Sequence, residues 1–261
     1  MGSFRLLLVG DVVGEGGCAA VQALVPGLRR ELELDAVIAN GENSEGGLGI
    51  TADTGEALLS AVDFLTLGDH AFDRQGVGEF LDREPRIVRP ANLDAELPGR
   101  GWGVLEAAGK RIGVANVQGQ VFMQTPRSPF EAAHRAVTEL EAAGAEFILL
   151  DVHAEATSEK EAMGWYLAGR VAAVLGTHTH VATADLRILP GGTAYATDVG
   201  MTGGVDSIIG FAREEWLRLF LEGGPLPETV PEDRVRLDAV LVEVGNRRAV
   251  SVERISRQWS G

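Results

Sequence analysis

The chain has 261 residues, of which 45% are hydrophobic and 23% are charged, an ordinary composition for a globular protein with one large α/β domain or two small ones. Its formal net charge of −15 and the lack of a basic patch in the sequence exclude a general affinity for duplex DNA, RNA or anionic membranes. Cys18 is the only cysteine, so no internal disulfide forms, and we expect a reducing compartment, the cytoplasm. The first apolar run ends at Asp11, too early for a signal peptide or a membrane span.

Apolar runs alternate with helical patterns along the chain. Continuous apolar runs are typical of strands covered on both faces, and they occupy residues 4–10, 35–40, 64–68, 147–152 and 171–176. Helical patterns lie between them, with Thr51 as one N-cap and Pro129 opening another helix. The predicted helices cover residues 17–32, 52–62, 75–82, 129–143 and 158–168.

The remaining apolar segments have the pattern of antiparallel strands. Residues 101–117 predict a hairpin that turns near Gly109, and residues 234–256 predict another that turns at Gly245-Asn246. Residues 184–200 add strands separated by Pro190 and two glycines. These strands outnumber what one doubly wound sheet needs. The sequence therefore predicts an α/β fold with four layers, an α/β/β/α sandwich, in a single domain over residues 1–261.

Polar side chains with metal-binding chemistry follow five of the predicted strands. In α/β sheets, ligand sites gather beyond the carboxyl ends of strands, so these side chains are expected to converge. A single Asp or Asn after a strand is more often a turn residue or cap than a ligand. Together, so many carboxylates and imidazoles at one rim would repel each other unless cations held them. The set comprises Asp11, Glu42, Asn43, Asp69, His70, His153, His178 and His180.

Two of these histidines are separated by a single threonine. Residues two apart in an extended chain point to the same side, so His178 and His180 can face one cluster and each serve a different metal ion. A purely structural pair is the alternative. The mixed oxygen and nitrogen set favours two transition-metal ions that share a carboxylate.

The segments that carry these residues resemble those of a known family. The segments "VGDVVGEGG", "NGENSEGGLGIT", "TLGDHAFD", "RPAN", "DVHAEATSEKEAMGWYLAGRVAAVLGTHTHVATAD" and "TDVGMTG" look like those of the YmdB-like bacterial metallophosphoesterases. This family is a branch of the calcineurin-like phosphoesterases and is described as acting on cyclic nucleotides. The resemblance implies a metallophosphoesterase-type sandwich and a hydrolase that cleaves phosphate diesters, with 2′,3′-cyclic nucleotides as the expected substrates.

The resemblance also implies roles for individual residues. Asp11, Glu42, Asn43 and His180 would hold one metal ion, and Glu42 would bridge to a second held by Asp69, His153 and His178. His70 would stand beside the cluster without ligating it. Iron is the favoured metal, with manganese as the alternative.

A mechanism follows from such a cluster. Two cations held by these residues would activate a water near neutral pH for attack on phosphorus in line with the leaving oxygen. His70 is then placed to protonate the departing alkoxide as a general acid.

Two positions depart from the family pattern. Asp69 stands where the family usually has Asn, and Gln120 stands where an Arg is expected. The first changes the charge of the cluster, and the second bears on contacts to phosphate or base.

Two other classes of function stay open from the sequence. Gly14, Gly16 and Ala19 match the G-x-G-x-x-A pattern of a dinucleotide-binding oxidoreductase, with Glu42 near the position of a ribose-binding acid. Asp11 would then repel the pyrophosphate, and the histidines would have no role. An acidic regulatory protein with a vestigial metal site is the third class. Tryptophans without a regular spacing also leave a homo-oligomer open.

Overall fold

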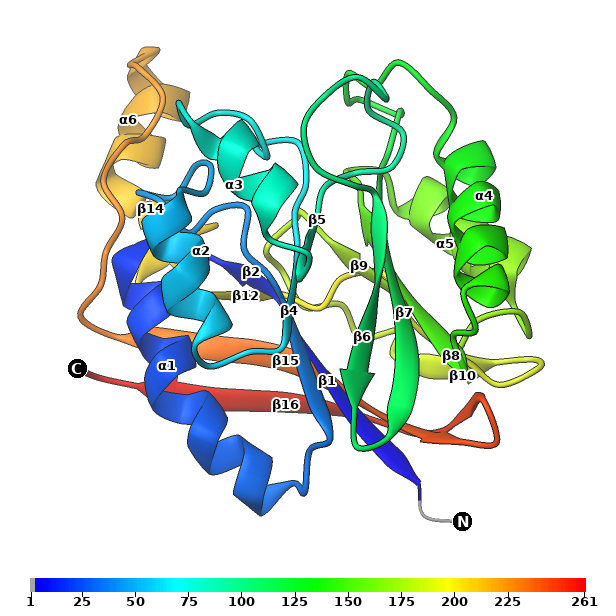
Figure 1. Ribbon diagram of the computed structural model, residues 1–261. Helices are drawn as coiled ribbons and strands as arrows, with labels where there is room; N and C mark the ends of the chain where they lie inside the picture. The colour runs from blue at the N-terminus through cyan, green and yellow to red at the C-terminus, as the bar shows by residue number, and fades with distance from the viewer. Residues whose placement is uncertain (1–2) are drawn as a thin grey trace.

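The apolar runs form two β-sheets that pack face to face, in a computed structural model that describes residues 3–261 (Figure 1). The first sheet has the strand order β2-β12-β15-β1-β3-β4-β5, with β16 on the free edge of β15. Its strands are β1 (Phe4–Val9), β2 (Asp11–Val12), β3 (Ala36–Asn40), β4 (Phe64–Thr66), β5 (Ile87–Val88), β12 (Met201–Gly204), β15 (Val235–Gly245) and β16 (Arg248–Trp259).

The second sheet has the order β10-β11-β9-β8-β7-β6. Its strands are β6 (Trp102–Ala107), β7 (Lys110–Gln118), β8 (Phe147–His153), β9 (Ala173–Thr177), β10 (Arg187–Leu189) and β11 (Thr193–Ala196). A separate small hairpin consists of β13 (Ser207–Ile208) and β14 (Phe211–Ala212).

Helices cover the outer face of each sheet, which confirms the predicted four layers. The first sheet is covered by α1 (Gly14–Glu31), α2 (Ala52–Leu59) and α3 (Val77–Arg83). The second is covered by α4 (Pro129–Ala142) and α5 (Thr157–Leu167). None of the helices in residues 3–261 is long and apolar enough to cross a lipid bilayer.

The core explains why β1 reads as an unbroken apolar run. Leu6 and Leu8 face the second sheet, whereas Leu7 and Val9 face the helices of the first sheet. Side chains alternate along a strand, so a strand buried on both faces needs apolar residues at every position. Cys18 lies in the helix-facing cluster, as expected for a core residue.

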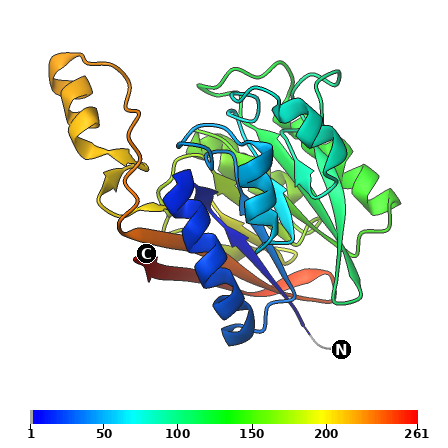
Figure 2. The same ribbon diagram turned by 60° about the vertical axis from the view of Figure 1, so that its left-hand side comes forward.

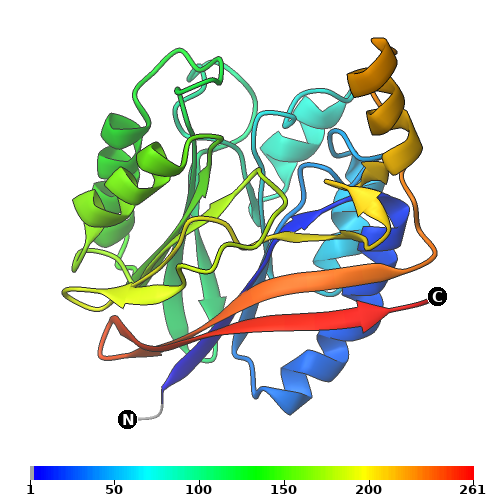
Figure 3. The ribbon, with the colours of Figure 1, turned by 180° about the vertical axis from the view of Figure 1, so that it is seen from behind.

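Most predicted boundaries agree with the structure. Thr51 caps α2 by accepting a hydrogen bond from the backbone N–H of Thr54, and Pro129 opens α4. The long hairpin of β15 and β16 crosses the back of the molecule (Figure 3). Its turn is one residue later than predicted, because Asn246 and Arg247 are the pair with positive φ, the conformation that a type I′ turn requires.

No helix or strand was predicted between residues 204 and 234, but the structure has a hairpin and a helix there. They are the β13–β14 hairpin and α6 (Arg213–Glu222), which projects from the body of the molecule (Figure 2). Helix α6 buries none of its residues. Trp216, Leu219 and Phe220 recur at the three- and four-residue spacing of a helix, so the prediction missed a signal that the sequence carries.

Candidate metal centre

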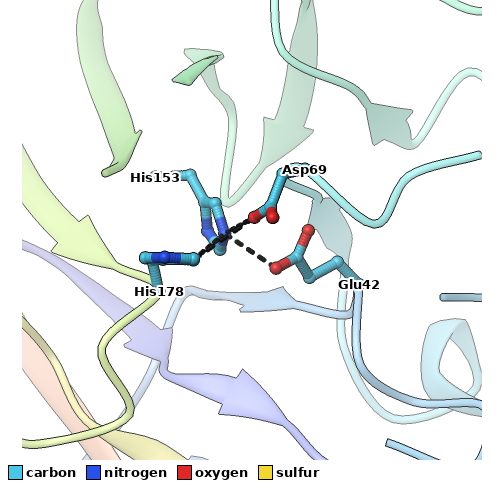
Figure 4. Close-up of side chains that lie close together, drawn as sticks. All are labelled: Glu42, Asp69, His153 and His178. Carbon is cyan, nitrogen blue, oxygen red and sulfur yellow. Dashed lines mark hydrogen bonds and ion pairs between the residues drawn. The ribbon is translucent and has the colours of Figure 1, made fainter. Parts of the chain in front are cut away.

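The carboxyl ends of strands from both sheets bring four side chains to one point. They come from the loops after β3, β4 and β9 and from the last residue of β8, and their ligand atoms all lie within 4.8 Å of one another (Figure 4). The four are Glu42, Asp69, His153 and His178. A side chain on Gly68 would collide with Glu42 and His153, so the close approach needs a glycine there.

Nε2 of His153 lies at the centre of this group. It is 2.7 Å from Oε1 of Glu42 and 3.0 Å from Oδ1 of Asp69. It also lies 3.0 Å from Nδ1 of His178. Four electron-rich ligand atoms therefore surround one small space, an arrangement that suits a cation.

The hydrogen bonds behind His153 leave this nitrogen free to ligate. Nδ1 of His153 lies 2.9 Å from the hydroxyl of Thr177, which donates in turn to Asp151 at 2.7 Å. Since Thr177 uses its proton on Asp151, it accepts from His153, and Nδ1 carries the imidazole proton. A buried oxygen partner of this kind fixes the tautomer of a ligating histidine. Thr66 and Asn40 donate to the other carboxylate oxygen of Asp151, at 2.6 and 3.0 Å.

The electrostatics of the group favour a positive charge at this point. Burial alone would lower the pKa of His153, but the charges of Glu42 and Asp69 outweigh it and raise that pKa well above its usual value. Burial alone would raise the pKa of Asp69, but hydrogen bonds from His153 and His178 outweigh it and lower that pKa. Both pKa shifts indicate that the site stabilises positive charge, and divalent metal ions can supply that charge in place of protons.

A second set of ligand atoms lies beside the first. Oδ1 of Asp11 is 4.0 Å from Nε2 of His180. Within residues 3–261, Oδ1 of Asp11 and Oδ1 of Asn43 are buried acceptors with no hydrogen-bond partner. Buried acceptors are rarely left unpaired, so two orphaned oxygens near an imidazole fit a second metal ion. Nδ1 of His180 donates to the carbonyl of Ile209 at 2.8 Å, which leaves Nε2 free.

His178 and His180 reach the site in a different conformation from the one predicted. Strand β9 ends at Thr177, and the two histidines have φ angles of 98° and 63°. The backbone at these two residues is therefore not extended. The prediction that both histidines face one cluster rested on an extended chain, and that reason is wrong. Left-handed backbone is strained for residues other than glycine, and it persists only where the surroundings enforce it.

Buried polar contacts enforce this turn. The backbone N–H and the hydroxyl of Thr179 donate to Asp198, at 3.1 and 2.8 Å. The ammonium of Lys160 donates to the same carboxylate at 2.9 Å and to the Thr177 carbonyl at 2.6 Å. Lys160 and Asp198 are both buried, and neither was singled out from the sequence. In the sequence, these two residues are distinguished only as charged residues next to apolar segments.

Glu155 was also missed. Its Oε2 lies 3.3 Å from Nε2 of His178, while Nδ1 of the same ring lies 3.2 Å from Asp69. His178 thus turns Nδ1 toward the cluster and Nε2 toward a carboxylate. The signal available in the sequence was the position of Glu155 two residues after His153.

His70 lies at the edge of the cluster rather than within it. Its backbone N–H donates to Glu42 at 3.0 Å, and Nδ1 of its ring lies 2.6 Å from Asp73. Burial alone would lower the pKa of His70, but Glu42, Asp69 and Asp73 outweigh it and raise that pKa. The opposite ring nitrogen is 3.7 Å from Asp69. A protonated imidazole with one nitrogen directed away from its anchoring carboxylate suits proton donation.

The glycines of the dinucleotide pattern have a structural explanation. A Cβ on Gly14 would lie 2.6 Å from the side chain of Val230, and one on Gly16 would lie 3.0 Å from that of Glu232. Residues of the same chain thus cover the start of α1, where a pyrophosphate would have to lie. The dinucleotide-binding alternative therefore has no support. Gln120, the other departure from the family pattern, is exposed and bonds the Thr125 carbonyl at 3.4 Å.

Comparisons with known proteins agree with this geometry. A model of the YmdB-like protein family matches residues 7–255. Over 254 residues the chain is 43% identical to the 2′,3′-cyclic-nucleotide 2′-phosphodiesterase of Bacillus subtilis (strain 168), and the alignment covers 96% of each protein. A solved structure of a hypothetical protein from Thermus thermophilus matches with a TM-score of 0.91 and 41% identity, over 98% of this chain and 99% of that one.

Another solved structure shares the fold at a much lower sequence identity. The calcineurin-like phosphoesterase YfkN from Bacillus subtilis matches with a TM-score of 0.53 and 12% identity, over 99% of this chain and 91% of that one. At that identity the likeness concerns the fold alone, and it confirms the predicted metallophosphoesterase type of sandwich. With matching family segments along nearly its whole length, this chain belongs to the YmdB-like family.

Proposed function

We propose that this protein is a metal-dependent phosphodiesterase that hydrolyses 2′,3′-cyclic nucleotides. The observation that carries the proposal is the group of two carboxylates and two imidazoles with ligand atoms within 4.8 Å of one another. Such a set suits transition metals, and a metal pair is a known solution for attack on a phosphate diester. The name of the Bacillus subtilis relative supports the choice of substrate.

Seven residues would hold two metal ions. One ion would lie between Asp69, His153 and His178, a second would lie beside Asp11, Asn43 and His180, and Glu42 would be shared. We favour iron, with manganese as the alternative, because both accept mixed nitrogen and carboxylate ligands. When bound, the ions supply Lewis acidity that activates water and neutralises charge on the phosphate.

His70 would act as the general acid. Its Nδ1–H donates to Asp73, so the ring is held with Nε2 available to the departing ester oxygen. Burial alone would lower the pKa of His70, but Glu42, Asp69 and Asp73 raise it, and this favours a proton on that nitrogen as well. For a 2′,3′-cyclic substrate the proton would go to a ribose oxygen, and the broken P–O bond would open the ring. Asp73 would position the imidazole without touching the substrate.

Metal analysis and a diesterase assay on one preparation test the proposal. We expect close to two transition-metal ions per chain and turnover of both bis(4-nitrophenyl) phosphate and 2′,3′-cyclic AMP. His178→Ala should lose metal and activity together, whereas His134→Ala, which changes an exposed histidine of α4, should lose neither. A metal-free protein with full diesterase activity would falsify the proposal. Bound metal without turnover would favour the acidic regulatory protein instead.

Three broader expectations stay predictions. They are a cytoplasmic location, a homo-oligomer, and a single domain over residues 1–261, of which residues 1–2 lie outside the described part. The exposed apolar residues Leu217, Phe220 and Leu221 on α6 support the second.

A further inference from the structure

A cavity of about 470 Å³ opens directly beside the candidate metal centre. Its polar lining includes Glu42, Asn43, His70, His178 and His180, so it reaches both proposed metal positions and the proposed acid. A cavity of this size takes a small organic ligand rather than a phosphate alone. The rest of its lining is apolar and consists mainly of Leu48, Ile209, Phe211, Trp216, Leu226 and Pro227.

Most of this apolar wall comes from residues 207–227, which lie outside the two main sheets. The segment is fixed to the metal centre at two points. Ile209 accepts the hydrogen bond from His180 at 2.8 Å. Phe211 packs on Gly47, where a Cβ would lie 2.7 Å from the aromatic ring. The wall therefore stands at a fixed distance from the metal ligands, which is what a specificity pocket requires.

Trp216 on α6 contributes a large aromatic side chain to this wall. Its ring stacks on Phe220, with centroids 5.3 Å apart and an angle of 20° between the planes. Its indole Nε1 is buried and has no hydrogen-bond partner among residues 3–261. This nitrogen is shielded from solvent, so Trp216 lines the cavity with its apolar ring. An aromatic heterocycle supplies the flat apolar faces that pack on such a wall.

A second cavity, of about 590 Å³, lies on the other side of Glu155 and His178. Phe122 lines it and is 89% exposed, so it offers a stacking surface but no enclosing wall. Among the residues that line this cavity, neither His70 nor Glu42 is present. A nucleotide whose phosphate is attacked beside His70 extends more directly into the first cavity.

We propose that the wall formed by Ile209, Phe211, Trp216 and Leu226 binds the nucleobase of the substrate, with Trp216 as its principal contact. This inference rests on the proposed function and adds the residues that select a nucleotide over other cyclic phosphates. The base would be held by apolar contact with these side chains. The segment 207–227 would therefore determine specificity without taking part in bond cleavage.

Substrates with and without a base test the assignment. In Trp216→Ala, KM for 2′,3′-cyclic AMP should rise about ten-fold, the usual effect of removing one aromatic partner of a base. For glycerol 1,2-cyclic phosphate, which has no base, KM should stay within about two-fold, as should kcat for both substrates. Trp216→Phe should recover the part of the affinity that comes from apolar contact. Leu221→Ala is the matched control, since it removes an exposed apolar side chain of α6 that does not line the cavity.

Equilibrium binding gives a readout that is independent of turnover. By calorimetry, 3′-AMP should bind Trp216→Ala about ten-fold more weakly than wild type, with binding of inorganic phosphate unchanged. An equal loss for both ligands, or no loss for either, overturns the inference. If Phe122→Ala shows the selective loss in place of Trp216→Ala, the base lies in the second cavity. Turnover of both substrates without a preference for the base refutes the subsite alone, whereas turnover of neither refutes the proposed function.

Discussion

Glu155 and His178 form a contact that sets which nitrogen of the imidazole faces the candidate metal centre. Oε2 of Glu155 lies 3.3 Å from Nε2 of His178, so Glu155 would accept the proton of Nε2 when Nδ1 ligates a metal ion. The sequence analysis assigned His178 as a ligand but had no means to choose between its nitrogens.

Removing this carboxylate should weaken metal binding without removing a ligand. We expect Glu155→Ala to lower metal affinity by about 10- to 100-fold, the usual effect of losing such an outer partner. Glu155→Gln should lose less, because its amide oxygen still accepts from the imidazole. Competition titration with a chelator measures the affinity, and Glu139→Ala on the outer helix α4 is the control. Unchanged affinity in Glu155→Ala would show that the contact does not orient His178.

His70→Ala should separate turnover from metal binding. We expect both metal ions to stay and kcat on 2′,3′-cyclic AMP to fall by about two to four orders of magnitude, the range for general acid–base groups. On bis(4-nitrophenyl) phosphate the loss should be much smaller, since nitrophenolate leaves without a proton. Asp73→Asn should give an intermediate loss, because Asp73 only orients and charges the ring. Loss of metal in His70→Ala would identify His70 as a ligand.

Asp69→Asn should change how strongly the cluster attracts anions. With Asp11, Glu42, Asp69 and a hydroxide, four negative charges meet two divalent ions, so the proposed cluster is formally neutral. Asn at position 69 leaves it at one positive charge, which should tighten the binding of phosphate. Inhibition by phosphate, measured on both proteins loaded with manganese, tests this. Weaker inhibition, or loss of one metal ion, would mean that Asp69 acts only as an anionic ligand.

Lys160→Met should destabilise the protein strongly. The change leaves the buried carboxylate of Asp198 without its ammonium partner, 2.9 Å away, and such a loss costs about 3–5 kcal/mol. Urea unfolding measures the free energy of unfolding. The matched control is Lys110→Met, which breaks an exposed pair with Glu146 and should change the free energy of unfolding little.

A double variant shows whether the lost stability comes from the unpaired charge. Lys160→Met with Asp198→Leu removes both charges and should recover much of the stability. The double variant should still bind metal weakly, because Thr179 loses the carboxylate that holds the turn between His178 and His180. Full metal binding in the double variant would contradict a role for Asp198 in that turn.

The layers of the fold and most of the candidate ligands could be predicted from the sequence. Both follow from local patterns, since apolar runs of strand length indicate buried strands and the polar residue after each strand lies at the same edge of a sheet. Glu42, Asp69 and His153 could therefore be assigned to one cluster without coordinates. Helix α6 was missed although its apolar residues recur at helical spacing, and only the structure shows that none of its residues is buried.

The way those ligands are held depends on contacts between distant segments of the chain, which the sequence does not reveal. The tautomer of His180 depends on the carbonyl of Ile209, 29 residues away along the chain, and the turn that carries it depends on Lys160 and Asp198, 38 residues apart. These partners are close in space but belong to segments that are far apart in the sequence, and no periodic sequence pattern connects them. The same holds for the cavity, since Trp216 and Phe211 approach the metal ligands only through the packing of a segment outside the main sheets.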